Sequence, residues 1–90
     1  MKTIYKYEVS PTDPRLEIEL PGSAKVVFVG SQLVGVVNFW VELDPGAAKH
    51  KRIFVLHGTG HNIPNNHDYI GSVLDSPFVW HLYEENSVHP

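Results

Sequence analysis

Leu16-Glu17-Ile18-Glu19-Leu20 is the clearest alternation of apolar and charged residues in the chain, and Pro21-Gly22 follows it directly. Successive side chains of an extended strand point to opposite faces. The segment therefore predicts a strand with its apolar side chains in a core and its glutamates in water. Pro-Gly has the chemistry of a turn, which ends the strand.

Further short strands are predicted on both sides of this segment. Residues 3–9 alternate in the same way, and residues 25–29 are apolar on both faces and rich in β-branched side chains. Gly30-Ser31 is then expected to turn a hairpin into a second strand over residues 33–43. Gly35, inside that strand, would mark a bulge or a close backbone approach. Phe39 and Trp40 would point to opposite faces of it.

The second half of the chain continues the pattern. Asp44-Pro45-Gly46 predicts a turn and residues 47–51 a polar loop, before an apolar strand over residues 52–56. Residues 68–74 are expected to begin as a helical turn and to finish as a strand. A last strand begins at Phe78, before a frayed end from about residue 85. We therefore expect an all-β fold: one small domain over residues 1–90, a sandwich or partly open barrel of six to seven mostly antiparallel strands with at most one short helical turn.

Composition narrows the class of protein. The 90 residues are 42% hydrophobic and 19% charged, as in an ordinary globular domain. The core is small and cysteine is absent, so self-association is a route to stability. The two-faced apolar strands at residues 26–29 and 33–41 favour a homo-oligomer, a dimer first of all.

Charge and hydropathy exclude two kinds of partner. The net charge is −3 and no basic stripe is visible, which argues against binding to nucleic acid. No apolar run is long enough for a membrane-spanning helix, and the opening residues lack the pattern of a signal peptide. We therefore expect a soluble cytoplasmic protein without a membrane partner.

The stretch from His57 to Asn66 is the longest irregular segment and the strongest candidate for a binding site. Its two glycines can let backbone N–H groups converge on an anion. The spacing matches neither a P-loop nor a dinucleotide-binding fingerprint. The alternative is a connector loop whose glycines only supply positive φ. The residues expected to bind a ligand are Arg52, His57, Gly58, Thr59, Gly60, His61 and Asn62, with Trp40 and Trp80 as stacking faces.

Metal and catalytic chemistry have weaker support. His57, His61 and His67 suggest zinc, but glycines interrupt the HxxxH pair, and Gly58 stands where a zinc protease needs glutamate. His57-Gly58-Thr59 has the form of a two-histidine phosphoesterase motif, yet a matching second motif is missing. The paired glutamates of the chain are expected to be solvated charges. We therefore expect no metal, no cofactor and no enzyme.

Several segments together carry a resemblance to a known family. The loop Gly58-Thr59-Gly60-His61-Asn62-Ile63-Pro64, the closing Phe78-Val79-Trp80-His81 run, and the segments at residues 2–7 and 69–73 resemble short proteins of tailed bacteriophages and prophages. The resemblance spans nearly the whole chain. It implies a phage-encoded accessory protein in the host bacterial cytoplasm, and it brings no catalytic residues.

Two functions remain open on these grounds. The first is a small oligomer that binds a nucleotide-like anionic ligand without converting it, and so acts as a sponge against host defence signalling. The second is a protein–protein or structural role through a strand edge or an aromatic surface. The first depends on the glycine loop, and the second on an exposed edge or face.

Overall fold

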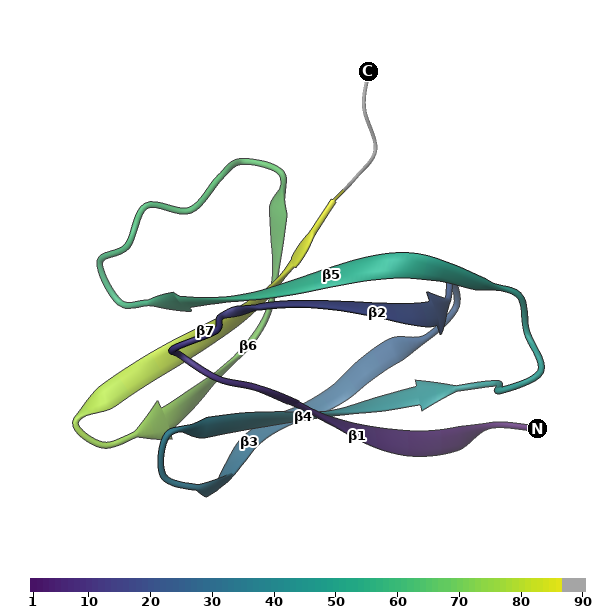
Figure 1. Ribbon diagram of the computed structural model, residues 1–90, viewed down its shortest axis with the longest axis horizontal. Coiled ribbons are helices and arrows are strands. Elements are labelled where there is room, and N and C mark those ends of the chain that lie inside the picture. Colours follow the sequence, from purple (N-terminus) through teal and green to yellow (C-terminus); the bar gives the residue numbers. More distant parts are fainter. Residues whose placement is uncertain (87–90) are drawn as a thin grey trace.

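The computed structural model describes residues 1–86, which form seven strands in two sheets (Figure 1). One sheet has the order β1-β4-β3 and the other β2-β5-β7-β6, with every neighbouring pair antiparallel. No helix occurs among the described residues, and the sheets stay open instead of closing into a barrel, so the all-β prediction is confirmed. The strands are β1 (Thr3–Val9), β2 (Arg15–Pro21), β3 (Lys25–Leu33), β4 (Val36–Leu43), β5 (Lys49–Gly58), β6 (His67–Asp75) and β7 (Phe78–Glu85).

The hydrophobic core lies between the two sheets. Leu20 is buried, Leu16 and Ile18 pack against the core, and the glutamates between them are exposed, which confirms the alternation predicted for β2. Phe39 is fully buried and Trp40 is only half-buried, as expected for opposite faces of β4. The buried apolar side chains are Val9, Leu20, Ala24, Val37, Phe39, Val41, Leu43, Phe54, Leu56 and Leu82.

The β3–β4 hairpin turns at a different place from the one predicted. β3 continues through Gly30 and Ser31, and the turn falls at Val34-Gly35, where Gly35 has a φ of 79°. Gly30 serves another purpose, because a Cβ there would lie 2.9 Å from Cε2 of Phe28. The predicted turn was therefore wrong: the glycine that makes room for a ring was mistaken for the glycine that reverses the chain.

The boundaries of three other segments also differ from prediction. β5 begins at Lys49, inside the expected polar loop, because it pairs with β2 as far as Pro21. β6 is a strand from His67 onward, so the helical turn expected near Asp68 is wrong: the first residues of β6 pair with the end of β7. The same pairing holds Glu85 in β7. The N–H of Asn86 donates to the carbonyl of Asn66 at 2.6 Å, so the chain is not frayed at residues 85 and 86, and residues 87–90 of the expected frayed end lie outside the described residues.

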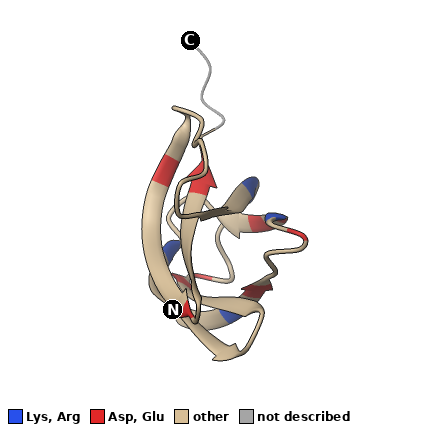
Figure 2. Ribbon diagram, turned by 90° about the vertical axis from the view of Figure 1, so that its left-hand side faces the viewer, with Lys and Arg blue, Asp and Glu red and all other residues tan. Residues whose placement is uncertain are grey.

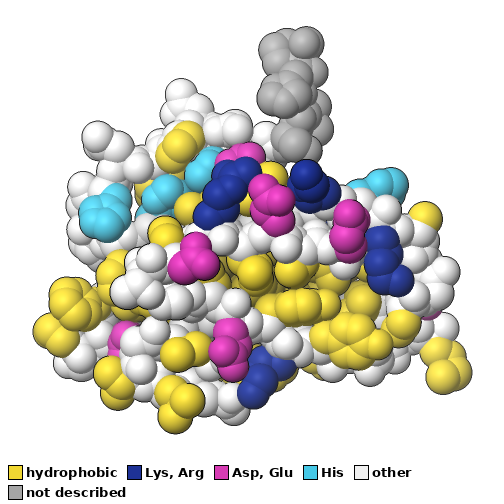
Figure 3. Space-filling model, viewed as in Figure 1, with side chains coloured by type: hydrophobic (Ala, Val, Ile, Leu, Met, Phe, Trp, Pro, Cys, Tyr) yellow, Lys and Arg dark blue, Asp and Glu magenta, His cyan; other side chains and the backbone are white. Residues whose placement is uncertain are grey.

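The two sheets approach each other along one side of the sandwich. β3 lies against β6, where a Cβ on Gly71 would be 3.0 Å from Cγ2 of Val29. On the other side, the edge strands β1 and β2 are not paired with each other within the described part of the chain. We call this the open side. Figure 3 shows hydrophobic side chains gathered in a band between these two strands.

Charged residues are spread over both sheets. Figure 2 shows Lys and Arg singly among Asp and Glu, in keeping with the net charge of −3 and with the absence of a basic stripe from the sequence. Over residues 1–86 there is no helix that is long and apolar enough to cross a membrane.

Candidate ligand-binding site

The β5–β6 loop (residues 59–66) begins with a tight turn. The N–H of His61 donates to the carbonyl of Gly58 at 3.1 Å, and Gly60, the third residue of the turn, has a φ of 90°. Positive φ at that position is what a type II turn needs. The N–H of Gly58 donates in return to Nδ1 of His61 at 3.1 Å. The imidazole thus folds back so closely that a Cβ on Gly58 would lie 2.9 Å from its Cε1 atom.

A pocket of about 490 Å³ lies beside this turn. Gly58, Thr59 and His61 line it, and the remaining lining comes from the β6–β7 turn and the start of β7, namely Pro77, Phe78, Val79 and Trp80. We call it the Trp80 pocket. The rings of Phe78 and Trp80 lie 5.5 Å apart at an interplanar angle of 34°, so the pocket has an aromatic wall.

The indole N–H of Trp80 lacks a hydrogen-bond partner. Its Nε1 atom is buried, and no other buried side-chain nitrogen or oxygen of the described residues is left unpaired. A buried donor without an acceptor costs about 1–3 kcal/mol, and such groups are rare in folded proteins. Because the Nε1 atom itself is closed off from solvent, the part of Trp80 that lines the pocket is its ring.

A pair of histidines joins the two ends of the loop. Nε2 of His57, near the end of β5, lies 2.9 Å from Nδ1 of His67, the first residue of β6. Nε2 of His67 is 3.5 Å from Oε1 of Glu85, which accepts a 2.8 Å hydrogen bond from Arg15. That bond lowers the pKa of Glu85. His57 is only 9% exposed, and burial, followed by the neighbouring histidines, lowers its pKa, so its neutral form is favoured.

A second chain of hydrogen bonds holds Thr59. The Tyr69 hydroxyl lies 2.7 Å from Oγ of Ser72, which lies 2.7 Å from Nδ1 of His81. Nε2 of His81 lies 2.9 Å from the Thr59 hydroxyl. A serine beside a histidine suggests a nucleophile, but a hydroxyl occupies the place of the carboxylate that would orient the imidazole in a triad. This arrangement favours a tether for the loop over a catalytic dyad.

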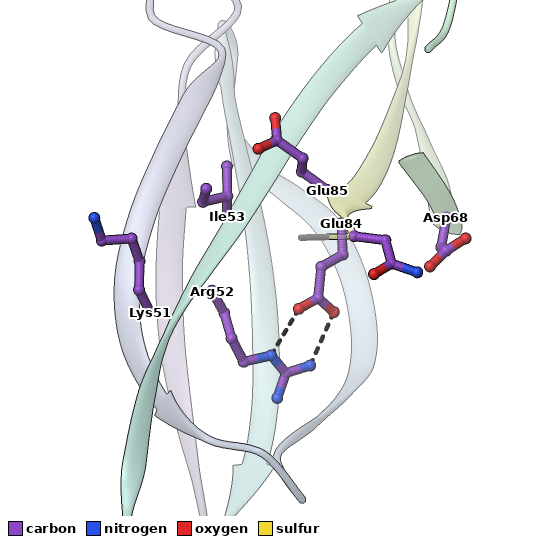
Figure 4. A pocket seen from close by; sticks show the side chains of 7 residues that line it. Lys51, Arg52, Ile53, Asp68, Glu84 and Glu85 are labelled. Atoms are coloured by element: carbon purple, nitrogen blue, oxygen red, sulfur yellow. Dashed lines mark hydrogen bonds and ion pairs between the residues drawn. The ribbon is translucent and has the colours of Figure 1, made fainter. Parts of the chain in front are cut away.

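Arg52 does not reach the loop. Its guanidinium makes a two-point ion pair with Glu84, at 2.7 and 2.9 Å, and donates to the carbonyls of Pro21 and Ala24 (Figure 4). The Glu84 hydrogen bond raises the pKa of Arg52. In Figure 4 the side chains of Lys51 and Asp68 point away from this pair. Part of the lining of the pocket drawn there is therefore an internal ion pair.

The remaining predicted site residues fall into two groups. Trp40 belongs to the other sheet, where its ring lies 5.4 Å from that of Phe28. Gly60 and Asn62 are exposed on the loop and do not line the pocket, and His57 is buried in the histidine pair. The structure thus brings together Gly58, Thr59, His61 and Trp80. Sequence reasoning missed Phe78, although its two-residue spacing from Trp80 places both rings on one face of β7.

The histidines are not arranged around a common centre. Figure 3 shows histidine side chains near the β5–β6 loop, but the facing nitrogens of His57 and His67 bond to each other. Within residues 1–86 no group of three or more His, Asp or Glu side chains is placed to hold a metal ion.

Fold and pocket together define a small, open, seven-stranded β-sandwich with an aromatic pocket beside a tethered glycine loop. The chain belongs to the family described as Domain of unknown function (DUF7352), which matches residues 1–90. No curated protein and no solved structure matches the chain. The family description names no activity.

Proposed function

We propose that this protein is a non-enzymatic binding protein that takes a nucleotide-like ligand in the Trp80 pocket. The observation that carries the proposal is the pair of aromatic rings, Phe78 and Trp80, in the lining of a pocket beside the glycine turn. A nucleobase has a flat face that suits these rings. Stacking of a base on an aromatic side chain is worth about 1–3 kcal/mol.

The pocket offers more contacts to the base of a nucleotide than to its phosphate. His61 is the one titratable side chain in the lining, and Arg52, which pairs with Glu84, is not part of that lining. The N–H groups of Gly58 and His61 are already used inside the turn. The anionic end of the ligand would therefore lie toward the exposed part of the loop, with the His61 ring as its nearest donor.

Binding without conversion agrees with the chemistry around the pocket. The hydroxyl of Thr59 is tied to His81, and the neighbouring Ser72 has no carboxylate-oriented base. On the resemblance of the sequence to short phage proteins, the ligand would be a host signalling nucleotide that this protein sequesters. A sponge of this kind requires affinity and abundance but no turnover.

Calorimetry with a panel of mono-, di- and cyclic nucleotides and ADP-ribose derivatives tests the proposal. We expect Trp80→Phe, which replaces the indole by a smaller ring, to weaken binding roughly three- to tenfold through the loss of stacking surface. Trp40→Phe makes the same chemical change away from the pocket and should bind as the wild type does. Gly60→Val should abolish binding with the strands intact, because a β-branched residue tolerates positive φ poorly.

His61→Ala completes the panel. Its loss should weaken binding by about 1–3 kcal/mol, as expected for a hydrogen bond to a charged group. Circular dichroism of each variant checks that the strands persist. The proposal fails if no member of the panel binds, or if wild type and Gly60→Val bind equally.

A protein-interaction role is the second candidate, and one observation favours it. Phe28 is 62% exposed and lies with Trp40 on the face of β3 and β4 turned away from the core. Exposed aromatic side chains are enriched at protein interfaces. The two tryptophan indole N–H signals in a nuclear magnetic resonance spectrum separate the candidates: a pocket ligand shifts the Trp80 signal, and a partner on this face shifts that of Trp40.

A further inference from the structure

β1 is an uncovered strand edge that faces the open side. Its hydrogen-bonded neighbour is β4, and within residues 1–86 no strand pairs with its other edge. Beside it, Tyr7, Leu16 and Ile18 are only partly buried, and Tyr5 is 45% exposed. The band in Figure 3 lies along this edge. Unpaired N–H and C=O groups next to exposed apolar surface form a template for another strand.

The other sheet edges are less available. β3 and β6 lie against each other. β2 follows Pro14 and ends at Pro21, and two of its outward charges are engaged: Arg15 pairs with Glu85, and Glu17 lies 3.9 Å from Nζ of Lys51. Prolines and charges of this kind protect an edge against pairing. β1 has no proline between its first and last residues.

We propose that β1 pairs antiparallel with β1 of a second copy of this chain, about a two-fold axis that passes beside Tyr7. Such a dimer joins two three-stranded sheets into one of six strands. The inward-facing Tyr5 and Tyr7 of each copy would then cover the open side. This interface is separate from the Trp80 pocket, so it does not depend on the proposed ligand.

The charges of β1 select the register. Side chains on one face of an antiparallel pair sit directly opposite each other, and like charges there repel. An axis at Lys6 would place Lys6 opposite the partner's Lys6, and an axis at Glu8 would place Glu8 opposite the partner's Glu8. An axis at Ile4 would place Lys2 opposite the partner's Lys6. An axis at Tyr7 places Lys6 opposite the partner's Glu8, and the symmetry repeats this pair.

One competing register has to be distinguished. An axis at Tyr5 places Lys2 opposite the partner's Glu8 and leaves Lys6 opposite the partner's Ile4. Lys2 already has a charged neighbour, Glu42, at 3.7 Å, whereas Lys6 donates at 2.9 Å to Gln32, which is uncharged, and Glu8 has no ion pair among the described residues. The Tyr7 register therefore makes the better use of the charges on this strand.

Sedimentation velocity of the full chain, from about one to a hundred micromolar, tests the dimer through charge reversal. Lys6→Glu and Glu8→Lys each convert two attractive pairs into two repulsive ones, so we expect each to raise the dimer dissociation constant roughly tenfold or more. Lys6→Glu combined with Glu8→Lys restores both pairs and should return the constant to within roughly threefold of the wild type. Lys25→Glu and Glu19→Lys make the same charge changes at exposed sites on other strands and should leave it unchanged.

The outcomes separate the registers and the surfaces. Sensitivity of the dimer to Glu8→Lys but not to Lys6→Glu, without rescue by the double variant, overturns the Tyr7 register in favour of the Tyr5 register. A wild type that stays monomeric throughout the range, or a dimer indifferent to both reversals, overturns the proposed interface. Circular dichroism shows whether each variant keeps its strands, which is expected because Lys6 and Glu8 are exposed.

Discussion

Replacement of Arg52 by methionine should be among the most destabilising single changes outside the apolar core. The guanidinium makes four hydrogen bonds, two to Glu84 and two to the carbonyls of Pro21 and Ala24. The pair thus ties β5 to β7 and to the β2–β3 connection. Methionine preserves much of the aliphatic length, so the loss reports mainly on these polar contacts.

The magnitude follows from the burial of the pair. Removing one member of a buried ion pair costs about 3–5 kcal/mol, because an uncompensated charge stays behind. The side chains of Arg52 and Glu84 are 17% and 26% exposed, so solvent screens part of this cost and we expect about 2–4 kcal/mol. With a urea m-value of about 1.5 kcal/mol/M, the unfolding midpoint should fall by roughly 1–3 M.

Arg15→Met is the matched control for Arg52→Met in the urea experiment. Arg15 also pairs with a glutamate, at 2.8 Å, but its side chain is 48% exposed. Its loss should move the midpoint far less. Adding Glu84→Gln to Arg52→Met should recover part of the lost stability, because no unpaired charge then remains. Equal midpoints for Arg52→Met and Arg15→Met would refute the assignment of Arg52 to a structural role.

Two further outcomes are expected. The pKa of His57 lies below its ordinary 6.5 in the folded chain, so as the pH falls the unfolded chain binds a proton at this histidine before the folded chain does. The contribution of neutral His57 to the free energy of unfolding is therefore full above about pH 6.5 and falls below that pH by at most about 1.4 kcal/mol per pH unit. Chemical denaturation at a series of pH values should find a smaller slope in His57→Gln. Chelation should leave the melting temperature unchanged, since the loop histidines lack a sound ligand pattern, and a large drop that zinc reverses would contradict this reasoning.

Local sequence patterns predicted the strands well because the alternation of apolar and polar side chains along a strand can be recognised from adjacent residues alone. The alternation at Leu16–Leu20 and the split between Phe39 and Trp40 needed no knowledge of neighbouring strands. The hairpin failed for a different reason. Gly30 and Gly35 look equivalent in sequence, but one accommodates the Phe28 ring and the other takes a φ of 79°. That distinction exists only after β3 and β4 have paired.

The candidate site was predictable to the extent that it is local. Gly58, Thr59 and His61 lie within four residues of one another, and their turn follows from the two glycines. The assignment of Arg52 depended on a choice among distant partners. Its partner Glu84 is 32 residues away and reaches it only because β5 pairs with β7. Sequence alone offered no reason to prefer that carboxylate to a phosphate.

Two sets of side-chain hydrogen bonds hold the β5–β6 loop, and they bear directly on the proposed binding mode. The His57–His67 bond closes the base of the β5–β6 loop, and the Thr59–His81 bond fastens its first residue to β7, the strand that carries Trp80. The turn and the aromatic wall are thus held together before any ligand arrives. A site built in advance has little loop entropy to lose on binding, so even a small aromatic ligand with one good hydrogen bond can gain useful affinity. His57, His67 and His81 would then serve binding through the shape of the loop, without touching the ligand themselves.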